Sequence, residues 1–265
     1  MSRPLKERAN LIDAREEHWK PPIYRTSTGA LTELRARLLR FFDLQSGTIW
    51  DDLAQELPAV SGTVVDVGCG VQPYRKLFGS GVKYIGIDYA DTRDHFRVET
   101  PDTLYYSGDR WPLDAEVADF ILCTETLEHI AAPDVFLGEM FRCLKPGGRA
   151  LLTIPFAARW HFIPYDYWRP TPSGLDNVFR KAGFTKIGVY GRGNTLTIAC
   201  YKGMAFIYSL LSPQKSSRGF AALSRLLGFL GIGPMVALAV LANATLGKQG
   251  SVDFLGFTIS VEKPA

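Results

Sequence analysis

The chain has 265 residues, 46% of them hydrophobic and 12% aromatic, and its formal net charge at pH 7 is +3. This length and apolar content predict one α/β domain with decorations, or a domain with a small subdomain. The slight charge, without a stripe of lysine and arginine, argues against a nucleic-acid partner.

The cysteines and the first residues indicate a cellular compartment. The four cysteines lie far apart and form no C-x-x-C pair, which is typical of small apolar residues in a reducing compartment. Residues 1–20 are charged throughout and lack the apolar stretch of a secretory signal. We therefore expect a cytoplasmic protein.

Residues 1–58 are predicted to form an arm followed by helices that cap the domain. The first 28 residues are polar and are interrupted by Pro21 and Pro22. Apolar residues recur at helical spacing over 31–44, among arginines, and a second helical pattern covers 49–57.

Residues 59–199 alternate apolar runs with helical patterns, which predicts a mostly parallel, Rossmann-like sheet with helices on both faces. We expect a final strand of the same sheet within 251–265. The predicted strands are 63–67, 83–88, 103–106, 118–123, 149–154, 187–190 and 254–261, and the predicted helices are 73–78, 133–144 and 174–182. Residues 145–148, a lysine, a proline and two glycines, are predicted to end the second of these helices.

The turn after the first predicted strand carries the main functional signal. Gly68 and Gly70 follow an apolar strand and let the backbone come close to a ligand. The next strand ends in Asp88, at the distance of about twenty residues from which an acidic side chain accepts hydrogen bonds from ribose hydroxyls. Pro73 stands where a dinucleotide fingerprint has its third glycine. S-adenosylmethionine (SAM) has no phosphate, so the pattern favours SAM over NAD or FAD; a plain Gly-Gly turn is the alternative.

Five motifs in this order resemble class I SAM-dependent methyltransferases, in particular the type-11 group. They are residues 66–70 (DVGCG), 86–88 (GID), 108–109 (GD), 125–130 (ETLEHI) and 144–148 (LKPGG). The resemblance covers about residues 60–190 and implies SAM as the cofactor and an antiparallel last strand. The chain departs from many members at Gln72, where they carry a third glycine.

The resemblance also implies which residues bind the cofactor. Asp66, Gly68 and Gly70 would hold the methionine end of SAM, and Asp88 would accept from the ribose hydroxyls. Asp109 would accept from the adenine amino group, with Arg110 and Trp111 beside the ring. The full predicted set is Asp66, Gly68, Cys69, Gly70, Asp88, Tyr89, Asp109, Arg110, Trp111 and Thr124.

The candidate catalytic segment is residues 160–169, directly after the strand 149–154. Loops at the carboxyl ends of parallel strands form the ligand crevice, so this segment should overhang the methyl group. His161 is suited to take a proton from a hydroxyl near neutral pH, and Asp166 and His129 are the other catalytic candidates. The alternatives are an ordinary loop histidine at 161, and an Asp166 that pairs with Arg169 or caps the next helix.

Glu125, Glu128 and His129 form an E-x-x-E-H spacing, which is a candidate metal-binding pattern. Together with His161 they could form an oxygen-rich Mg²⁺ or Mn²⁺ site. The same letters also occur where a glutamate and a histidine simply begin a helix near SAM. We expect no metal.

Residues 200–250 are predicted to form an apolar helical insertion. No charged residue occurs between Arg225 and Lys248, a run long enough for a membrane span. Glycines and Pro234 interrupt the run, and a single crossing would leave the strand 254–261 on the wrong side of the bilayer. We expect a lid, a homodimer surface or a peripheral membrane contact through residues 200–248.

These observations predict a SAM-dependent methyltransferase. The expected reaction is O-methylation of a small molecule, a glycan or a lipid-linked intermediate. The alternatives are a catalytically silent methyltransferase-like scaffold, which uses the insertion for assembly or membrane docking, and an NAD-dependent oxidoreductase, which Pro73 disfavours.

Overall fold

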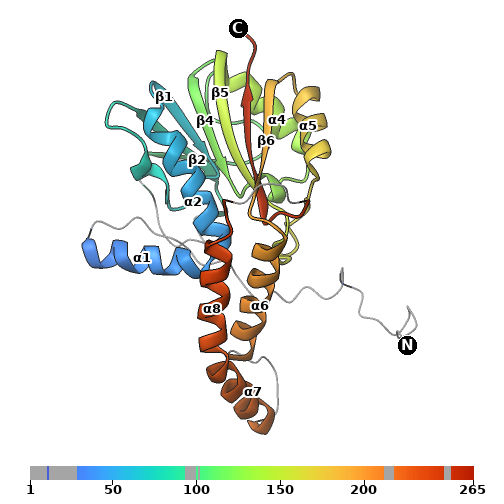
Figure 1. Ribbon diagram of the computed structural model, residues 1–265. Helices are drawn as coiled ribbons and strands as arrows, with labels where there is room; N and C mark the ends of the chain where they lie inside the picture. The colour runs from blue at the N-terminus through green and yellow to red at the C-terminus, as the bar shows by residue number, and fades with distance from the viewer. Residues whose placement is uncertain (1–10, 12–28, 93–99, 101, 212–217, 248–251) are drawn as a thin grey trace.

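The computed structural model describes residues 11, 29–92, 100, 102–211, 218–247 and 252–265 (Figure 1). The predicted N-terminal arm therefore lies, apart from residue 11, outside the described residues. The helices are α1 (Ala30–Phe42), α2 (Leu44–Glu56), α4 (Pro133–Cys143), α5 (Pro172–Lys181), α6 (Thr195–Leu211), α7 (Arg218–Leu230) and α8 (Ile232–Asn243), with short 3₁₀ helices η2 (Leu57–Ala59), η3 (Arg75–Leu77) and η4 (Leu127–His129). The strands are β1 (Thr63–Val67), β2 (Lys83–Tyr89), β3 (Thr103–Tyr106), β4 (Ala118–Thr124), β5 (Leu144–Pro155), β6 (Thr185–Arg192) and β7 (Gly256–Glu262).

The strands form one seven-stranded sheet in the order β3-β2-β1-β4-β5-β7-β6. Strands β1 to β5 run parallel to one another, and β7 runs antiparallel to both β5 and β6. This confirms the predicted Rossmann-like sheet with an antiparallel last strand. The strand order reverses between β1 and β4, and in open α/β sheets ligands bind at the carboxyl edge beside such a reversal.

Helices cover both faces of the sheet because its central strands are apolar on both sides. Alternate residues of β4 show this: Ile121 joins the core cluster under α4 and α5, whereas Leu122 joins the cluster under α2. Each face buries its own set of apolar side chains, which stabilises the sheet by roughly 25 cal/mol per Å² of apolar surface removed from water.

Two local predictions differ from the structure. The helix predicted over 73–78 is only the three-residue 3₁₀ helix η3. Residues 145–148 do follow the end of α4, as predicted, but they belong to β5, whose pairing with β4 shifts register between Ala118 and Phe120. Gly147 takes a φ of +73° there, a left-handed conformation that favours glycine.

Helices α6, α7 and α8, which we call the apolar stalk, project from the carboxyl edge of the parallel strands (Figure 1). The stalk begins after Arg192 at the end of β6 and ends before Gly256 at the start of β7, and these two residues pair across the strands. Its helical part starts at Thr195, before the predicted residue 200. A small core of Cys200, Met204, Ala239 and Ala242 holds α6 and α8 together at its base.

Arg192 ties the stalk end of β6 to the rest of the domain. Its side chain is 1% exposed, and Nη2 donates to Glu125 Oε1 at 3.0 Å and to the Ile154 carbonyl at 3.3 Å, while Nη1 donates to the Gln45 carbonyl at 3.2 Å. A β-carbon on Gly256 would lie 2.3 Å from Arg192 Nη2, so glycine is needed beside the guanidinium.

Replacing Arg192 by methionine should lower the free energy of unfolding by about 3 kcal/mol, because Glu125 and two carbonyls lose a buried partner. Urea denaturation measures this difference. The matched control is Lys186→Met on the same strand, which breaks an exposed pair with Glu262 and should cost less than about 1 kcal/mol. Equal losses for the two variants would contradict the assigned role of Arg192.

Candidate functional site

The turn after β1 lies against the segment that follows β4. Gly68 and Gly70 have φ values of +67° and +51°. A β-carbon on Gly68 would lie 2.2 Å from Thr126 Oγ1, so no larger residue fits there without movement. At the reversal between β1 and β4, the half-buried backbone of Gly68 and Gly70 therefore lies beside the Thr126 side chain, at the edge where ligands of such sheets bind.

Asp88 lies beside this turn, as predicted. Its Oδ2 accepts from the Gly70 amide and its Oδ1 from the Tyr89 amide, both at 2.8 Å, and the residue is 6% exposed. Burial raises the pKa of Asp88, and the two backbone hydrogen bonds oppose that shift. Each carboxylate oxygen has a second lone pair, so the fixed carboxylate can still accept hydrogen bonds from a diol.

Gln72 occupies the space under the turn. It takes a φ of +55°, and its Nε2 donates to Thr103 Oγ1 at 2.9 Å while its Oε1 accepts from Arg75 at 3.0 Å. Glycine adopts this left-handed backbone easily, which agrees with the glycine that the resemblance leads us to expect at this position. Because only the short η3 follows, the turn offers no long helix N-terminus to a pyrophosphate.

The segment predicted to face adenine is only partly exposed. The Tyr89 hydroxyl donates to the Gly108 carbonyl at 2.8 Å, which places Asp109 near Asp88 along one edge; partial burial and the Asp109 carboxylate raise the pKa of Tyr89. Asp109 and Arg110 are exposed. Trp111 is 2% exposed and packs edge-on against Phe136 in the core, so its ring does not reach the surface beside them.

Asp66 points into the protein and not toward the turn's outer surface. Its Oδ2 accepts from the Tyr84 hydroxyl at 2.6 Å, and its Oδ1 is buried without a hydrogen-bond partner. Burial raises the pKa of Asp66 to about 7, and the Tyr84 hydrogen bond only partly offsets it. Of the other predicted contacts, Cys69 is buried with its Sγ 3.7 Å from Thr103 Oγ1, and the Thr124 carbonyl accepts from Thr126.

The loop after β5 joins His161 to a buried ion pair. The Nδ1 of His161 lies 2.8 Å from the Arg159 carbonyl and 3.2 Å from Asp166 Oδ2. Both terminal nitrogens of Arg169 donate to Asp166, at 2.6 and 2.7 Å. Burial alone would raise the pKa of Asp166, but the hydrogen bonds from His161 and Arg169 outweigh it and hold the pKa below its usual range. The pairing of Asp166 with Arg169 is thus present together with a contact to His161, whereas Thr171 caps α5.

A second histidine and a buried glutamate lie beside His161. The rings of His129 and His161 are 5.0 Å apart, and His129 Nδ1 lies 2.6 Å from the Tyr165 carbonyl. Burial, with a smaller contribution from His161, lowers the pKa of His129 to about 4. Glu128 is fully buried and neither of its carboxyl oxygens has a hydrogen-bond partner; burial and the Glu125 carboxylate raise its pKa. His129 is therefore uncharged at neutral pH, and burial favours the protonated form of Glu128.

The candidate metal cluster is smaller than the one considered from the sequence. One ligand atom each from Glu128, His129 and His161 lie within 4.8 Å of one another. Glu125, the second carboxylate of the E-x-x-E-H spacing, instead pairs with Arg192 at 3.0 Å. One carboxylate and two imidazoles are not the oxygen-rich set that Mg²⁺ prefers. The expectation that the protein binds no metal stays a prediction.

Several residues of the site escaped the sequence reasoning. Thr126 closes over Gly68, Tyr84 partners Asp66, and Arg192 holds Glu125. Thr126 belongs to the motif at 125–130 and directly follows the end of β4, and this position indicates that it lies near the glycine turn. Arg192 is 67 positions from its partner along the chain, and nothing in the local sequence indicates the pair.

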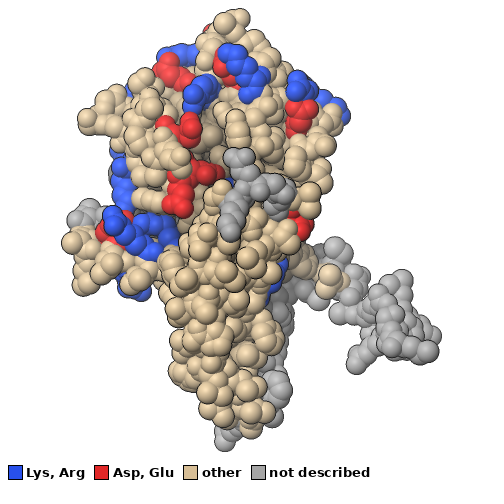
Figure 2. Space-filling view, viewed as in Figure 1, with Lys and Arg blue, Asp and Glu red and all other residues tan. Residues whose placement is uncertain are grey.

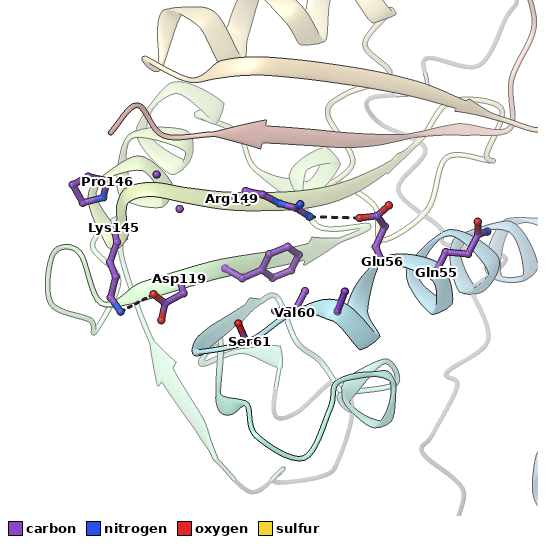
Figure 3. A pocket seen from close by; sticks show the side chains of 12 residues that line it. Gln55, Glu56, Val60, Ser61, Asp119, Lys145, Pro146 and Arg149 are labelled. Atoms are coloured by element: carbon purple, nitrogen blue, oxygen red, sulfur yellow. Dashed lines mark hydrogen bonds and ion pairs between the residues drawn. The ribbon is translucent and has the colours of Figure 1, made fainter.

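A hollow lies at the opposite edge of the sheet. It has a volume of about 520 Å³ and is lined by the start of β4, the start of β5 and the end of α2 (Figure 3). Its charged side chains pair with one another, Lys145 with Asp119 at 2.7 Å and Arg149 with Glu56 at 3.5 Å. Because ligands of such sheets bind at the carboxyl edge, we place the functional site at the glycine turn and not in this hollow.

Known proteins resemble this chain over most of the sheet domain. A family model described as a methyltransferase domain matches residues 32–188. An uncharacterized methyltransferase of Mycobacteroides abscessus is 32% identical over 114 residues, which cover 38% of this chain and 44% of the relative. One from Mycolicibacterium vanbaalenii is also 32% identical, over 40% of this chain and 44% of the relative. The chain thus matches less than half the length of these two relatives.

Solved structures share the fold at low sequence identity. A SAM-dependent methyltransferase from Thermotoga maritima has a TM-score of 0.52 and 17% identity, over 87% of this chain and 95% of that one. A SAM-dependent methyltransferase from Archaeoglobus fulgidus has a TM-score of 0.52 and 12% identity, over 86% of this chain and 99% of that one. At these identities the likeness shows the fold alone. The family match spans more than half of the sequence, and the chain therefore belongs to the methyltransferase domain family.

Proposed function

We propose that the protein is a SAM-dependent methyltransferase of the type-11 group that methylates an oxygen of its acceptor. The observation that carries the proposal is the Asp88 carboxylate, fixed by the amides of Gly70 and Tyr89 at the reversal between β1 and β4. Membership of the methyltransferase domain family supports the reaction class.

The residues at the turn fit SAM. Asp88 offers two remaining lone pairs to the ribose diol, and Gly68 and Gly70 leave backbone exposed for the methionine end. Asp109 and Arg110 are exposed on the side of Tyr89 where the adenine would lie. When bound, SAM supplies a methyl group on a positively charged sulfur, which an acceptor atom displaces in line.

His161 is the residue that we propose takes the proton from an acceptor hydroxyl. Its Nδ1 faces the Arg159 carbonyl and Asp166, so Nδ1 carries the hydrogen and Nε2 is the basic nitrogen. Asp166 fixes the ring and stabilises the imidazolium that forms, and Arg169 keeps Asp166 ionised. His129 has a pKa of about 4, which is too low for an efficient general base at neutral pH. We assign it to hold the loop through the Tyr165 carbonyl.

Asp66 is proposed to support the turn from below and not to touch the cofactor. It is buried against Tyr84, with one oxygen unpaired, and its pKa of about 7 leaves it largely protonated below neutral pH. A carboxyl held in this way fixes β1 against β2 just before Gly68. This differs from the role that the resemblance assigns to it.

Isothermal titration calorimetry with S-adenosylhomocysteine tests the cofactor site. Replacing Asp88 by alanine should weaken binding by roughly 1–3 kcal/mol, about fivefold to more than a hundredfold, because the diol loses its acceptor. Asp91→Ala, an exposed neighbouring carboxylate, serves as the matched control and should bind like the unaltered protein. If the unaltered protein shows no binding heat, the proposed function fails.

The pH dependence of stability tests the assignment of Asp66. Its folded pKa of about 7 lies above the usual 3.8, so the folded state holds a proton that the unfolded state has lost. The stabilisation that the protonated Asp66 gives to the folded state is full below pH 3.8, and it is lost as the pH rises toward about 7. The free energy of unfolding of Asp66→Asn should therefore fall less with rising pH than that of the unaltered protein. Parallel pH profiles, measured by urea denaturation, would contradict the assignment.

Methyl transfer from methyl-labelled SAM into hydroxyl-bearing extracts tests His161. His161→Gln should lower turnover by about 10²-fold or more while leaving S-adenosylhomocysteine affinity unchanged, because only proton transfer is lost. Tyr165→Phe, on the same loop and exposed, is the control with near-normal turnover. Full turnover in His161→Gln rejects the base, and bound cofactor without turnover in any extract indicates the silent scaffold.

A further inference from the structure

The apolar stalk exposes large hydrophobic side chains along its length. On the face shown in Figure 2, its distal part shows no charged side chain, whereas charged side chains are scattered over the sheet domain. Within α7, Arg225 is exposed among the apolar residues. Phe229 and Leu230 are 65% and 69% exposed, values that a soluble helix seldom gives to several large apolar side chains together. The exposed set is Leu196, Phe206, Tyr208, Leu223, Leu226, Leu227, Phe229, Leu230, Ile232, Val236, Val240 and Leu241.

These side chains lie on several faces of the stalk, as the exposed residues Leu226, Leu227, Phe229 and Leu230 of one helix show, which favours lipid over a protein partner. Helices α6 and α8 pack on each other through Met204 and Ala239, so Phe206 on α6 and Val240 on α8 are exposed on outer faces of the pair. A protein partner would cover one side of the stalk. Acyl chains surround an inserted element on all sides.

The geometry of the stalk fits one leaflet of a bilayer. Among the described residues no single helix is both long and apolar enough to cross a membrane, and only the pair Ala221–Leu230 and Ile232–Asn243, bent by 48°, meets both conditions together. The twelve residues of α8 extend roughly 18 Å, and a hydrocarbon leaflet is about 15 Å thick. The stalk leaves and re-enters the sheet at the paired residues Arg192 and Gly256, so the domain stays on one side.

Helix α1, at the base of the stalk, has the pattern of an interfacial helix. Leu31, Leu34 and Leu38 are exposed at helical spacing, and the exposed Arg35 and Arg37 flank them. Glu33 of α1 pairs with Lys76 of η3, which ties α1 to the domain, and also with Arg37 and Arg40 of its own helix. The Phe41 carbonyl accepts from Asn243 of α8 at 3.0 Å, which joins this helix to the stalk.

The proposed catalytic loop lies at the same edge. Arg159 donates to the Ala205 carbonyl of α6 at 2.9 Å, and Lys202 of α6 donates to the Ala157 carbonyl. The loop also exposes four aromatic side chains, Trp160, Tyr165, Tyr167 and Trp168. Exposed tryptophan and tyrosine beside an apolar insertion are typical of the headgroup level of a membrane.

We propose that the protein docks on a lipid bilayer by inserting the apolar stalk into one leaflet, with the leucine face of α1 and the aromatic loop at the headgroups. Arg35 and Arg37 add attraction to anionic lipid. Docking brings the glycine turn and His161 next to the bilayer surface. Resting on the proposed function, this identifies the acceptor class as a hydroxyl on a lipid-linked molecule and not a freely diffusing one.

Flotation with lipid vesicles tests the docking without any substrate. The full chain should float with vesicles of phosphatidylcholine containing about one third phosphatidylglycerol, and less with phosphatidylcholine alone. The double variant Phe229→Glu and Leu230→Glu should reduce the bound fraction at least about tenfold, since both side chains would otherwise enter lipid. Both residues are exposed, so folding is preserved. The control is Val135→Glu, an exposed apolar residue in the first turn of α4.

A fluorophore reports whether the stalk itself enters the lipid. The four native cysteines are buried, so Phe229→Cys can be labelled selectively with an environment-sensitive dye. Its emission should shift to the blue with vesicles and be quenched by brominated acyl chains. An unchanged spectrum, equal flotation of the double variant, or a stable dimer that excludes vesicles would each overturn the proposal.

The two proposals fail separately. Calorimetry with S-adenosylhomocysteine reports only on the cofactor site, and flotation reports only on the stalk. If both succeed, methyl label from SAM should enter the organic phase of a lipid extract and the double variant should lose most of that incorporation. Incorporation into water-soluble molecules only, with the double variant unimpaired, would reject the lipid-linked acceptor while leaving the methyltransferase intact.

Discussion

The hydrogen bond from the Gly70 amide to the Asp88 carboxylate is the interaction on which the site depends. It joins the ends of β1 and β2 at the place where the strand order reverses, and Gly70 takes a φ of +51° there, a conformation that glycine adopts easily. The carboxylate is thereby fixed before any ligand arrives, so ligand binding does not have to order it. The rest of the proposed site is arranged around this fixed acceptor.

Buried ionisable groups set the electrostatic character of the same edge. Asp66 and Glu128 are buried with unpaired oxygens and raised pKa values, so they are neutral over part of the acidic range. Asp166, in contrast, stays ionised because Arg169 and His161 donate to it. At Asp88 the two backbone hydrogen bonds oppose the effect of burial, and at Asp166 the donors outweigh it. The pKa of each buried carboxyl therefore depends on how many hydrogen-bond donors it has.

The sequence predicted those features that depend on neighbouring residues and missed those that depend on distant ones. The strands were predictable because apolar runs buried on both faces are short and distinct, as in β1 and β4. The position of Asp88 beside the glycine turn was predictable because its distance from the turn follows from the strand–turn–strand geometry. Trp111 was misplaced beside the adenine, since sequence cannot tell an aromatic that stacks on a ligand from one that packs on Phe136. The pairing of Glu125 with Arg192 was missed because it is formed only by the fold.

The position of the stalk relative to the sheet places the apolar helices and the candidate site at the same edge of the domain. In an open parallel sheet the ligand crevice lies at the carboxyl edge, and the antiparallel β7 forces any insertion between β6 and β7 to leave from that same edge. An apolar insertion there necessarily stands at the same edge as the glycine turn and beside the loop of His161, to which Arg159 and Lys202 tie it. If the stalk lies in lipid, the site faces the headgroups, because the stalk and the site share this edge of the sheet. The topology of the last two strands therefore links the choice of acceptor to the membrane.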